Sequence, residues 1–284
     1  MAWMIRSREV PGQRRNRAAG YVVARLLVAL LLVDLLVLAL VAVIPATASA
    51  DPPPVTPLPT GTDVDYQLGG AAEMPDHVGI VVRDRTDSPA DGRYNVCYVN
   101  GFQTQPDQRR FWKRHWRLVL KDGGEPVADE AWGEWLLDVR TEAKRADLAR
   151  VVGRWVRGCA ADGFDAVEYD NLDSFTRSHR LVARRQALAY ARLLVRAGHR
   201  AGLAVGQKNL AGYDGTAIGY DFAVAEECGR YRECASYVRH YGDRVLAIEY
   251  RRANFRWTCA HVGDRLAVVL RDRDLTPTGV HEWC

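Results

Sequence analysis

The sequence predicts an α/β fold, a (β/α)₈ TIM barrel to which one extra strand could be added. Short apolar runs typical of buried strands alternate with helical stretches, and this alternation indicates a parallel sheet. Nine such runs fall within residues 64–284, which is enough for a closed barrel. An open doubly wound sheet is the alternative, but no glycine-rich nucleotide-binding motif follows the first predicted strand.

The predicted elements follow one another in a regular order. Strands are predicted at Val64–Leu68, Gly79–Arg83, Asn95–Val99, Trp135–Val139, Phe164–Asp170, Leu203–Lys208, Phe222–Glu227, Val245–Tyr250 and Leu266–Leu270. Helices are predicted at Phe111–Val119, Lys144–Asp162 and Val182–Ala201. The last helix carries Leu188, Ala191, Leu194 and Val195 at the three- and four-residue spacing of one helix face.

Residues 1–50 have the pattern of a targeting segment. An arginine-rich start precedes the apolar run Leu26–Ile44, and an Ala-Ser-Ala cleavage pattern stands before Asp51. We therefore expect a signal peptide. Asp34 interrupts the apolar run, which is also long for a signal core, so an N-terminal membrane anchor is the alternative.

The rest of the chain divides into a linker and one domain. Residues 51–63 are rich in proline and predict an extended linker, and residues 64–284 predict the barrel. We expect the protein to be secreted or, if the leader is not cleaved, anchored in a membrane with an extracellular domain. Contact with a membrane is expected only through the leader.

Charge also separates the leader from the domain. Residues 1–50 hold six of the 39 basic and two of the 35 acidic residues, which leaves 33 of each in residues 51–284. Binding to nucleic acid requires a basic face. The balanced charge of the mature chain therefore argues against a nucleic-acid partner.

The six cysteines form an even set, as expected in an oxidising compartment. Cys228 and Cys234 are close enough to staple a short loop, and Cys259 with Cys284 would tie down the C-terminal tail. Cys97 and Cys159 lie in apolar segments and could be free buried thiols. None of these spacings is that of a zinc site.

Polar residues stand at the ends of nearly all the predicted strands, where the active sites of TIM barrels form. In chain order these are Asp84, Tyr98, Asn100, Asp138, Arg140, Glu168, Asp170, Asn171, Asp173, Gln207, Lys208, Asn209, Glu226, Glu227, Glu249 and Tyr250. Glu168 and Asp170 share one strand face, and Lys208 would lie among acids that it could hold in the ionised form.

Paired carboxylates without nearby histidine ligands suit glycoside hydrolysis, in which one acid protonates the leaving oxygen and the other attacks the sugar or activates water. Two alternatives remain open at this point. The barrel could bind carbohydrate without cleaving it. It could also be a metal-dependent hydrolase with Glu168, Asp170 and Asp173 around Mg²⁺ or Ca²⁺.

Six short motifs, in order, resemble glycoside hydrolase family 114, the endo-α-1,4-polygalactosaminidases. They are Val96-Cys97-Tyr98, the segments Glu134–Arg140, Gly163–Asp173 and Gly202–Asn209, Asp221–Cys228 with Cys234, and Val245–Tyr250. The resemblance implies a TIM barrel that cleaves α-1,4-linked galactosamine polymers with an Asp and a Glu, without a metal or cofactor. The substrate would be a cationic amino-sugar polysaccharide, which suits an acid-lined groove.

Transferred residue by residue, the resemblance assigns the catalytic pair to Asp170 and Glu227. The residues expected to bind substrate are Asp84, Tyr98, Asp138, Glu168, Asn171, Asp173, Lys208, Asn209 and Tyr250. The chain departs from the family pattern in two places. Tyr169 replaces the usual proline between Glu168 and Asp170, and Val99-Asn100-Gly101 replaces a small-residue stretch after Tyr98. The second departure implies a different sugar or substituent at that wall.

Overall fold

The computed structural model describes residues 54–284. The expected signal peptide or anchor at residues 1–50, and the first three residues of the expected linker, lie outside this range. Within it, no helix combines the length and apolar character needed to cross a membrane. Residues 54–62 form neither helix nor strand, yet Leu58 is buried against the barrel interior and Tyr94 Oη donates a hydrogen bond of 2.8 Å to the Thr56 carbonyl.

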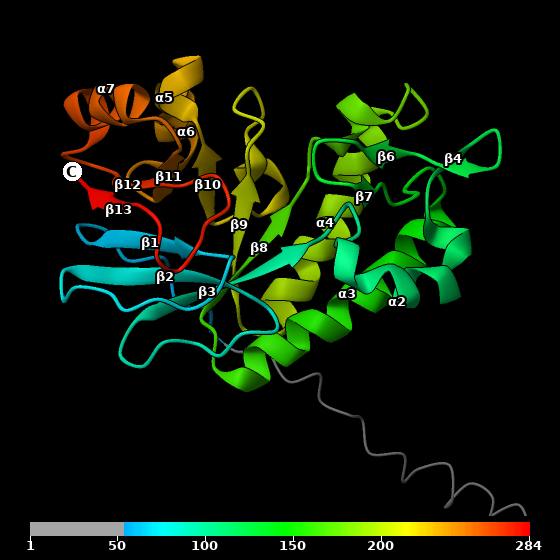
Figure 1. The fold of residues 1–284 in the computed structure, drawn as a ribbon. Helices are drawn as coiled ribbons and strands as arrows, with labels where there is room; N and C mark the ends of the chain where they lie inside the picture. Colours follow the sequence, from blue (N-terminus) through cyan, green and yellow to red (C-terminus); the bar gives the residue numbers. More distant parts are fainter. Residues whose placement is uncertain (1–53) are drawn as a thin grey trace, which may run out of the picture. The chain divides into compact units, whose positions relative to one another are not determined.

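Eight parallel strands form a nearly closed barrel, which confirms the predicted fold class (Figure 1). A ninth strand joins its end in the antiparallel direction and is the extra strand. The parallel strands are β1 (Asp63–Gln67), β2 (Val78–Asp84), β3 (Tyr94–Asn100), β8 (Ala166–Asp170), β9 (Ala204–Lys208), β10 (Phe222–Glu226), β11 (Val245–Glu249) and β12 (Ala267–Arg271), and the added strand is β13 (His281–Trp283).

Helices cover the barrel from outside. The helices predicted at Lys144–Asp162 and Val182–Ala201 are present with small shifts at their ends, whereas the one predicted at Phe111–Val119 is a short helix that ends at Arg114, followed by a separate 3₁₀ turn. Helices α3 and α4 pack beside β3, β8 and β9, whereas α5, α6 and α7 pack beside β10, β11 and β12 (Figure 1). The helices are α2 (Arg109–Arg114), α3 (Glu142–Asp162), α4 (Arg184–Arg200), α5 (Cys228–Tyr231), α6 (Cys234–Tyr241) and α7 (Arg252–Val262), with 3₁₀ turns η1 (Pro106–Gln108), η2 (Trp116–Leu118), η3 (Ser174–Arg177) and η4 (Gly215–Ile218).

The strand predicted at Trp135–Val139 is wrong, because β3 pairs directly with β8. Residues 101–141 instead form a lobe with its own hydrogen bonds: Leu137 N donates to Phe102 O, and Asp138 N donates to Leu118 O. Most of its apolar side chains are buried in the core between the barrel and the helices, whereas Trp116 and Trp132 are exposed. Short apolar runs of this kind do not distinguish a barrel strand from other buried segments. The lobe contains β4 (Lys121–Asp122), β5 (Glu125–Pro126), β6 (Ala128–Asp129) and β7 (Glu134–Trp135).

The barrel interior is filled by every second side chain of each strand, as the period of a strand requires. Its lower layers are apolar and include Tyr66, Ile80, Val224 and Ile248. Gly206 is needed at one position because the Phe222 ring lies against its backbone, where an added Cβ would come within 2.6 Å of that ring. Above these layers, toward the carboxyl ends of the strands, the interior becomes polar.

The seam between β1 and β12 carries no backbone ladder, and side chains from the C-terminal hairpin close it. Arg271 is fully buried; its guanidinium donates hydrogen bonds to Asp65 Oδ1 at 3.0 Å and to the Tyr66 carbonyl. His281 Nδ1 lies 3.0 Å from the Asp65 carboxylate, and Trp283 Nε1 donates to the Val64 carbonyl at 2.8 Å. Strand β13 therefore ties the last barrel strand to the first.

Three disulfides link all six cysteines. Cys228–Cys234 and Cys259–Cys284 match the expected pairs. Cys97 and Cys159 are also bonded, so their interpretation as free thiols is wrong. The Cys97 side chain points out of β3 toward α3, which carries Cys159 and packs on that strand. Two cysteines in apolar segments were thus brought together by the packing of a helix on a strand.

The buried Arg271–Asp65 pair gives a test of the seam. We expect Arg271→Met to lower the free energy of unfolding by about 3 kcal/mol, because the Asp65 carboxylate would lose its buried guanidinium partner. Arg265→Met removes a half-exposed arginine that pairs with Asp243, and should cost less than about 1 kcal/mol. Urea unfolding measures both values, and equal losses for the two variants would contradict the role given to the seam.

Candidate active site

A cavity of about 440 Å³ opens where the parallel strands end. This is the end of a TIM barrel at which active sites form. It brings together most of the residues that the sequence predicted to bind or act on substrate, namely Asp84, Tyr98, Asp170, Asn171, Asp173, Lys208, Asn209 and Tyr250.

Lys208 stands at the centre of the cavity floor. Strand β9 carries it into the barrel between β8 and β10, and its side chain is only 2% exposed. Its ammonium nitrogen Nζ lies 2.9 Å from Glu168 Oε1, 3.2 Å from Asp170 Oδ1 and 3.4 Å from Glu226 Oε2. The Lys208 ammonium group therefore contacts carboxylates from both strands that flank β9, namely β8 and β10.

The charge of Lys208 is maintained by these partners. Burial by itself lowers the pKa of a lysine, but Asp170, Glu168 and Glu226 outweigh that effect and raise the pKa of Lys208 well above its ordinary value. The side chain is thus a fixed positive charge inside the barrel.

Asp170 lies at the end of β8, and each of its two carboxylate oxygens contacts another side chain. Oδ1 is near Lys208, and Oδ2 accepts a 2.8 Å hydrogen bond from Tyr98 Oη on β3. Burial raises the pKa of Tyr98 well above its ordinary value, so this phenol remains a donor. The Asp170 side chain is still 19% exposed and can meet a ligand in the cavity.

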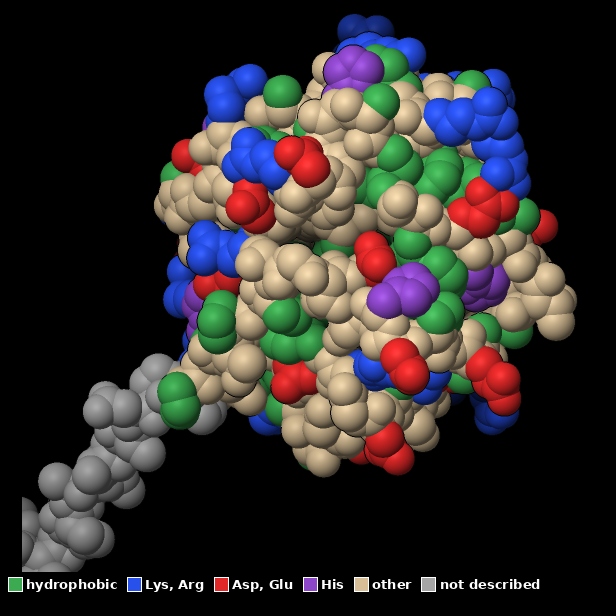
Figure 2. All heavy atoms as spheres, turned by 90° about the vertical axis from the view of Figure 1, so that its left-hand side faces the viewer, with side chains coloured by type: hydrophobic (Ala, Val, Ile, Leu, Met, Phe, Trp, Pro, Cys, Tyr) green, Lys and Arg blue, Asp and Glu red, His purple; other side chains and the backbone are tan. Residues whose placement is uncertain are grey.

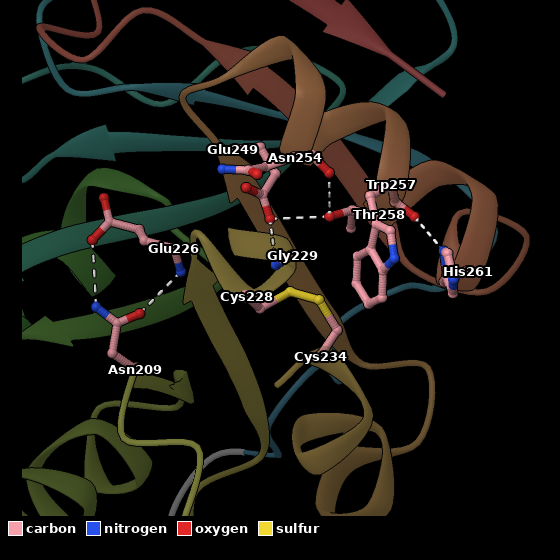
Figure 3. The surroundings of a disulfide bond; sticks show 10 residues. All are labelled: Asn209, Glu226, Cys228, Gly229, Cys234, Glu249, Asn254, Trp257, Thr258 and His261. Atoms are coloured by element: carbon pink, nitrogen blue, oxygen red, sulfur yellow. Dashed lines mark hydrogen bonds between the residues drawn. A yellow bond between two sulfur atoms is a disulfide. The ribbon is translucent and has the colours of Figure 1, made fainter. Parts of the chain in front are cut away.

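Glu226, rather than Glu227, faces the same cavity. Phe222, Val224 and Glu226 point into the barrel on alternate positions of β10. Tyr250 Oη donates a close hydrogen bond to Glu226 Oε1, and Asn209 Nδ2 lies 3.4 Å from Oε2. Figure 3 shows Glu226 turned toward Asn209, on the side of β10 away from the Cys228–Cys234 disulfide.

Glu227 leaves the strand in a left-handed conformation, with φ 55°, and its side chain turns outward. Its carboxylate lies 2.9 Å from Arg230 Nη1 and 3.6 Å from Arg273 Nη1. It lines a neighbouring cavity but not the one that contains Lys208. Strand periodicity was the signal that could have favoured Glu226, because a shift of one residue changes the face of the sheet.

Two other expected residues are not in contact with the cavity. Glu168 is fully buried beneath it, where Oε1 accepts hydrogen bonds from Tyr66 Oη at 2.5 Å and from Lys208. Burial, partly offset by Lys208, raises the pKa of Glu168 to about 7. Asp138 lies in the lobe of residues 101–141, where Arg140 and Lys144 occupy its carboxylate.

The lobe contributes a wall whose residues are not among the predicted site residues, although the sequence offered Trp132 as one of several aromatic side chains that could stack on a sugar. Trp132 and Glu134 both line the cavity. Glu134 Oε2 accepts hydrogen bonds from Asn100 Nδ2 at 2.9 Å and Asn171 Nδ2 at 3.3 Å. Burial raises the pKa of Glu134 to about 7, although the hydrogen bond from Asn100 acts in the opposite direction. The lobe is fixed to the barrel by Arg177, which pairs with Asp129 and Asp173.

A second cavity of about 600 Å³ continues from the first. The two share Trp132, Asp173, Asn209, Glu226 and Tyr250 in their linings, so they form one cleft. Tyr231 lines only the second part and is 60% exposed. Glu226 therefore stands near the middle of an elongated cleft.

The cluster does not suit a divalent cation at Glu168, Asp170 and Asp173. The Lys208 ammonium already occupies the position between Glu168 and Asp170, and Arg177 neutralises Asp173. Glu249 comes close to Cys228 and Cys234, but their disulfide leaves no thiolate ligand. Figure 3 shows Glu249 directed instead at Gly229 N and Thr258 Oγ1. The hypothesis of a metal-dependent hydrolase therefore has no support from the cavity residues.

Comparisons with known proteins agree with this architecture. The chain resembles the structure of Aspergillus fumigatus Ega3 in complex with galactosamine, with a TM-score of 0.67 and 18% identity over 82% of this chain and 100% of that one. It also resembles the glycoside hydrolase domain of PelA from Pseudomonas aeruginosa, with a TM-score of 0.56 and 17% identity over 80% and 100% of the two chains. No match was found among curated proteins.

The sequence identities to these structures are too low to assign a family, but a family model does assign one. The model of glycoside hydrolase family GH114 matches residues 45–284, which include the whole barrel and every residue of the cleft. The resemblance seen in the short sequence motifs is thereby confirmed. The chain belongs to glycoside hydrolase family GH114 and is a glycosidase built on a TIM barrel.

Proposed function

We propose that the protein is an exported endo-acting hydrolase of α-1,4-linked galactosamine polysaccharides, with Asp170 and Glu226 as its carboxylate pair. The observation that carries this proposal is the position of both carboxylates within 3.4 Å of Lys208 Nζ, on the floor of an open cleft. Glu226 replaces the Glu227 of the sequence-based assignment, because Glu227 is turned toward Arg230 and Arg273.

The spacing of the pair allows hydrolysis with retention of configuration. Asp170 Oδ1 and Glu226 Oε2 lie 3.2 Å and 3.4 Å from the same nitrogen, so the two oxygens are at most 6.6 Å apart, the sum of these distances. Retaining glycosidases place their carboxyl groups about 5–5.5 Å apart, whereas inverting enzymes leave room for a water molecule at about 6.5 Å or more. A direct attack by one carboxylate suits this geometry.

We assign the attack to Asp170 and the proton transfers to Glu226. The Asp170 carboxylate, held by Lys208 and Tyr98, forms a bond to the anomeric carbon while Glu226 gives its proton to the departing glycosidic oxygen. A water molecule then gives a proton to the Glu226 carboxylate and attacks the same carbon, which releases Asp170. Glu226 is suited to this role by its place between the two parts of the cleft.

The shape and charge of the cleft support a polymeric, cationic substrate. Two connected cavities extend on both sides of Glu226, as cleavage within a chain requires. The first is rich in carboxylates that attract ammonium groups. The family and the galactosamine complex of the similar Ega3 structure agree with this chemistry.

Three disulfides support an exported enzyme, since such bonds persist in oxidising compartments. On the face shown in Figure 2, basic and acidic side chains are interspersed. This mixed charge agrees with a near-neutral enzyme that finds its substrate through the acidic cleft rather than through its whole surface.

The choice of Glu226 over Glu227 can be tested with three variants. We expect Asp170→Asn and Glu226→Gln each to lower kcat on a galactosamine polymer by about a thousandfold, since each removes a group that acts in bond cleavage. Glu227→Gln should keep at least about a tenth of the wild-type rate, because it alters only an ion pair in the second part of the cleft, away from Lys208. Release of reducing ends is the measurement. Near wild-type turnover by Glu226→Gln would refute the assignment, and saturable binding without any cleavage by the wild type would favour a binding protein.

Glu134 gives a prediction for the dependence of stability on pH. Its pKa is raised to about 7 in the folded state, so the folded protein binds more protons than the unfolded chain between about pH 4.5 and 7. Stability from this group is complete at low pH and is lost as the pH rises through 7. The free energy of unfolding of Glu134→Gln, measured relative to that of the wild type, should therefore rise by about 2 kcal/mol from pH 5 to pH 8.

The control is Glu130→Gln, which alters an exposed glutamate in the same lobe. Chemical denaturation at both pH values should show no comparable gain for this variant. A Glu134→Gln profile parallel to that of the wild type would contradict the ionisation of a buried Glu134. Above pH 7 the ionised carboxylate is available to an ammonium group of the substrate, at a cost in stability.

A further inference from the structure

The two parts of the cleft differ in charge balance. In the first part, three lining aspartates have no cationic side chain within 4.0 Å among residues 54–284, namely Asp84, Asp107 and Asp274. They are in addition to the carboxylates that Lys208 and Arg177 neutralise. This part of the cleft therefore presents unpaired negative charge to a ligand.

The second part has a single carboxylate of this kind among residues 54–284, that of Glu233. Glu227 is paired with two arginines, since Arg230 and Arg273 both lie within 3.6 Å of its carboxylate. The lining also presents two exposed aromatic side chains, Trp132 and Tyr231, which are 51% and 60% exposed. Aromatic faces that are this open to a groove are suited to stack on the apolar faces of sugar rings.

Arg273 stands where the two parts meet, and it lines both. Its guanidinium carbon lies 5.6 Å from the ring centroid of Trp132 and 5.7 Å from that of Tyr250. The side chain is 57% exposed, so its donors remain open to a ligand beside its contact with Glu227. A permanent positive charge thus stands next to the aromatic platform of Trp132.

We propose that Arg273 makes the Trp132 side of the cleft select an N-acetylated sugar unit over one with a free ammonium group. An ammonium on a sugar stacked at Trp132 would face the guanidinium and be repelled, whereas an acetamide carbonyl can accept hydrogen bonds from it. The unpaired carboxylates of the first part receive the free-amine unit. The inference rests on the proposed function and names its substrate class as a partly N-acetylated galactosamine polymer.

Charge and length at position 273 can be separated by two variants. Arg273→Gln removes the charge and keeps an amide donor, whereas Arg273→Lys keeps the charge. We expect Arg273→Gln to raise kcat/KM on fully deacetylated α-1,4-galactosamine polymer about tenfold relative to a half-acetylated polymer. Arg273→Lys should keep the wild-type preference. The gain of Arg273→Gln should shrink in 0.5 M salt, because the repulsion between exposed charges is screened.

Arg265→Gln is the matched control, since Arg265 is an exposed arginine in an ion pair with Asp243, next to the amino ends of β11 and β12 and away from the cleft. It should leave the preference unchanged. Equal effects of Arg273→Gln on both polymers, or a gain that is independent of salt, would overturn the role of Arg273 while leaving the proposed function in place. A wild-type enzyme that cleaves neither polymer would overturn the proposed function itself.

Discussion

A single buried ammonium group organises the site. Burial of Lys208 removes a charge from water, and this cost is offset only because three carboxylates lie around it. The strands must therefore keep the register that places Glu168, Asp170 and Glu226 about one nitrogen. The same contacts hold Asp170 and Glu226 close together, so the interactions that stabilise the barrel floor also set the spacing of the proposed carboxylate pair.

The barrel and the lobe of residues 101–141 contribute differently to the cleft. The strands and their ends supply the charged floor and the tyrosine donors that contact the proposed carboxylate pair. The lobe supplies Trp132 and Glu134, and Arg177 joins it to β8 through Asp129 and Asp173. The lobe and the loop after β12 can thus vary in sequence without alteration of the proposed carboxylate pair, which the strands carry.

Strand and helix patterns predicted the barrel because its buried strands are short apolar runs with polar ends. The run at Trp135–Val139 has the same composition but bonds within the lobe, and only the tertiary partners of its amide groups distinguish the two cases. Similarly, the acidic residues at the end of β8 were predicted as site residues because several of them cluster at a strand end. Asp138 also stands at the end of a predicted strand, but its carboxylate pairs with Arg140 and Lys144 and does not line the cavity.

The adjacent glutamates show where sequence reasoning reached its limit. A motif located the pair Glu226-Glu227, and the alternation of side chains along β10 places Glu226 in the barrel, whereas Glu227 follows the strand in a left-handed turn. The disulfide between Cys97 and Cys159 depends likewise on the contact between α3 and β3, which no spacing in the chain reveals.

The seam between β1 and β12 has a consequence for the order of events when the chain is made. Val64 and Asp65 find their partners in Arg271, His281 and Trp283, at the opposite end of the domain. A barrel emerging from a ribosome or an export channel therefore holds an unpaired edge until about 220 residues have followed the first strand. Until then, its first strand is available to other chains, and a chaperone that shields this edge would raise the yield of enzyme.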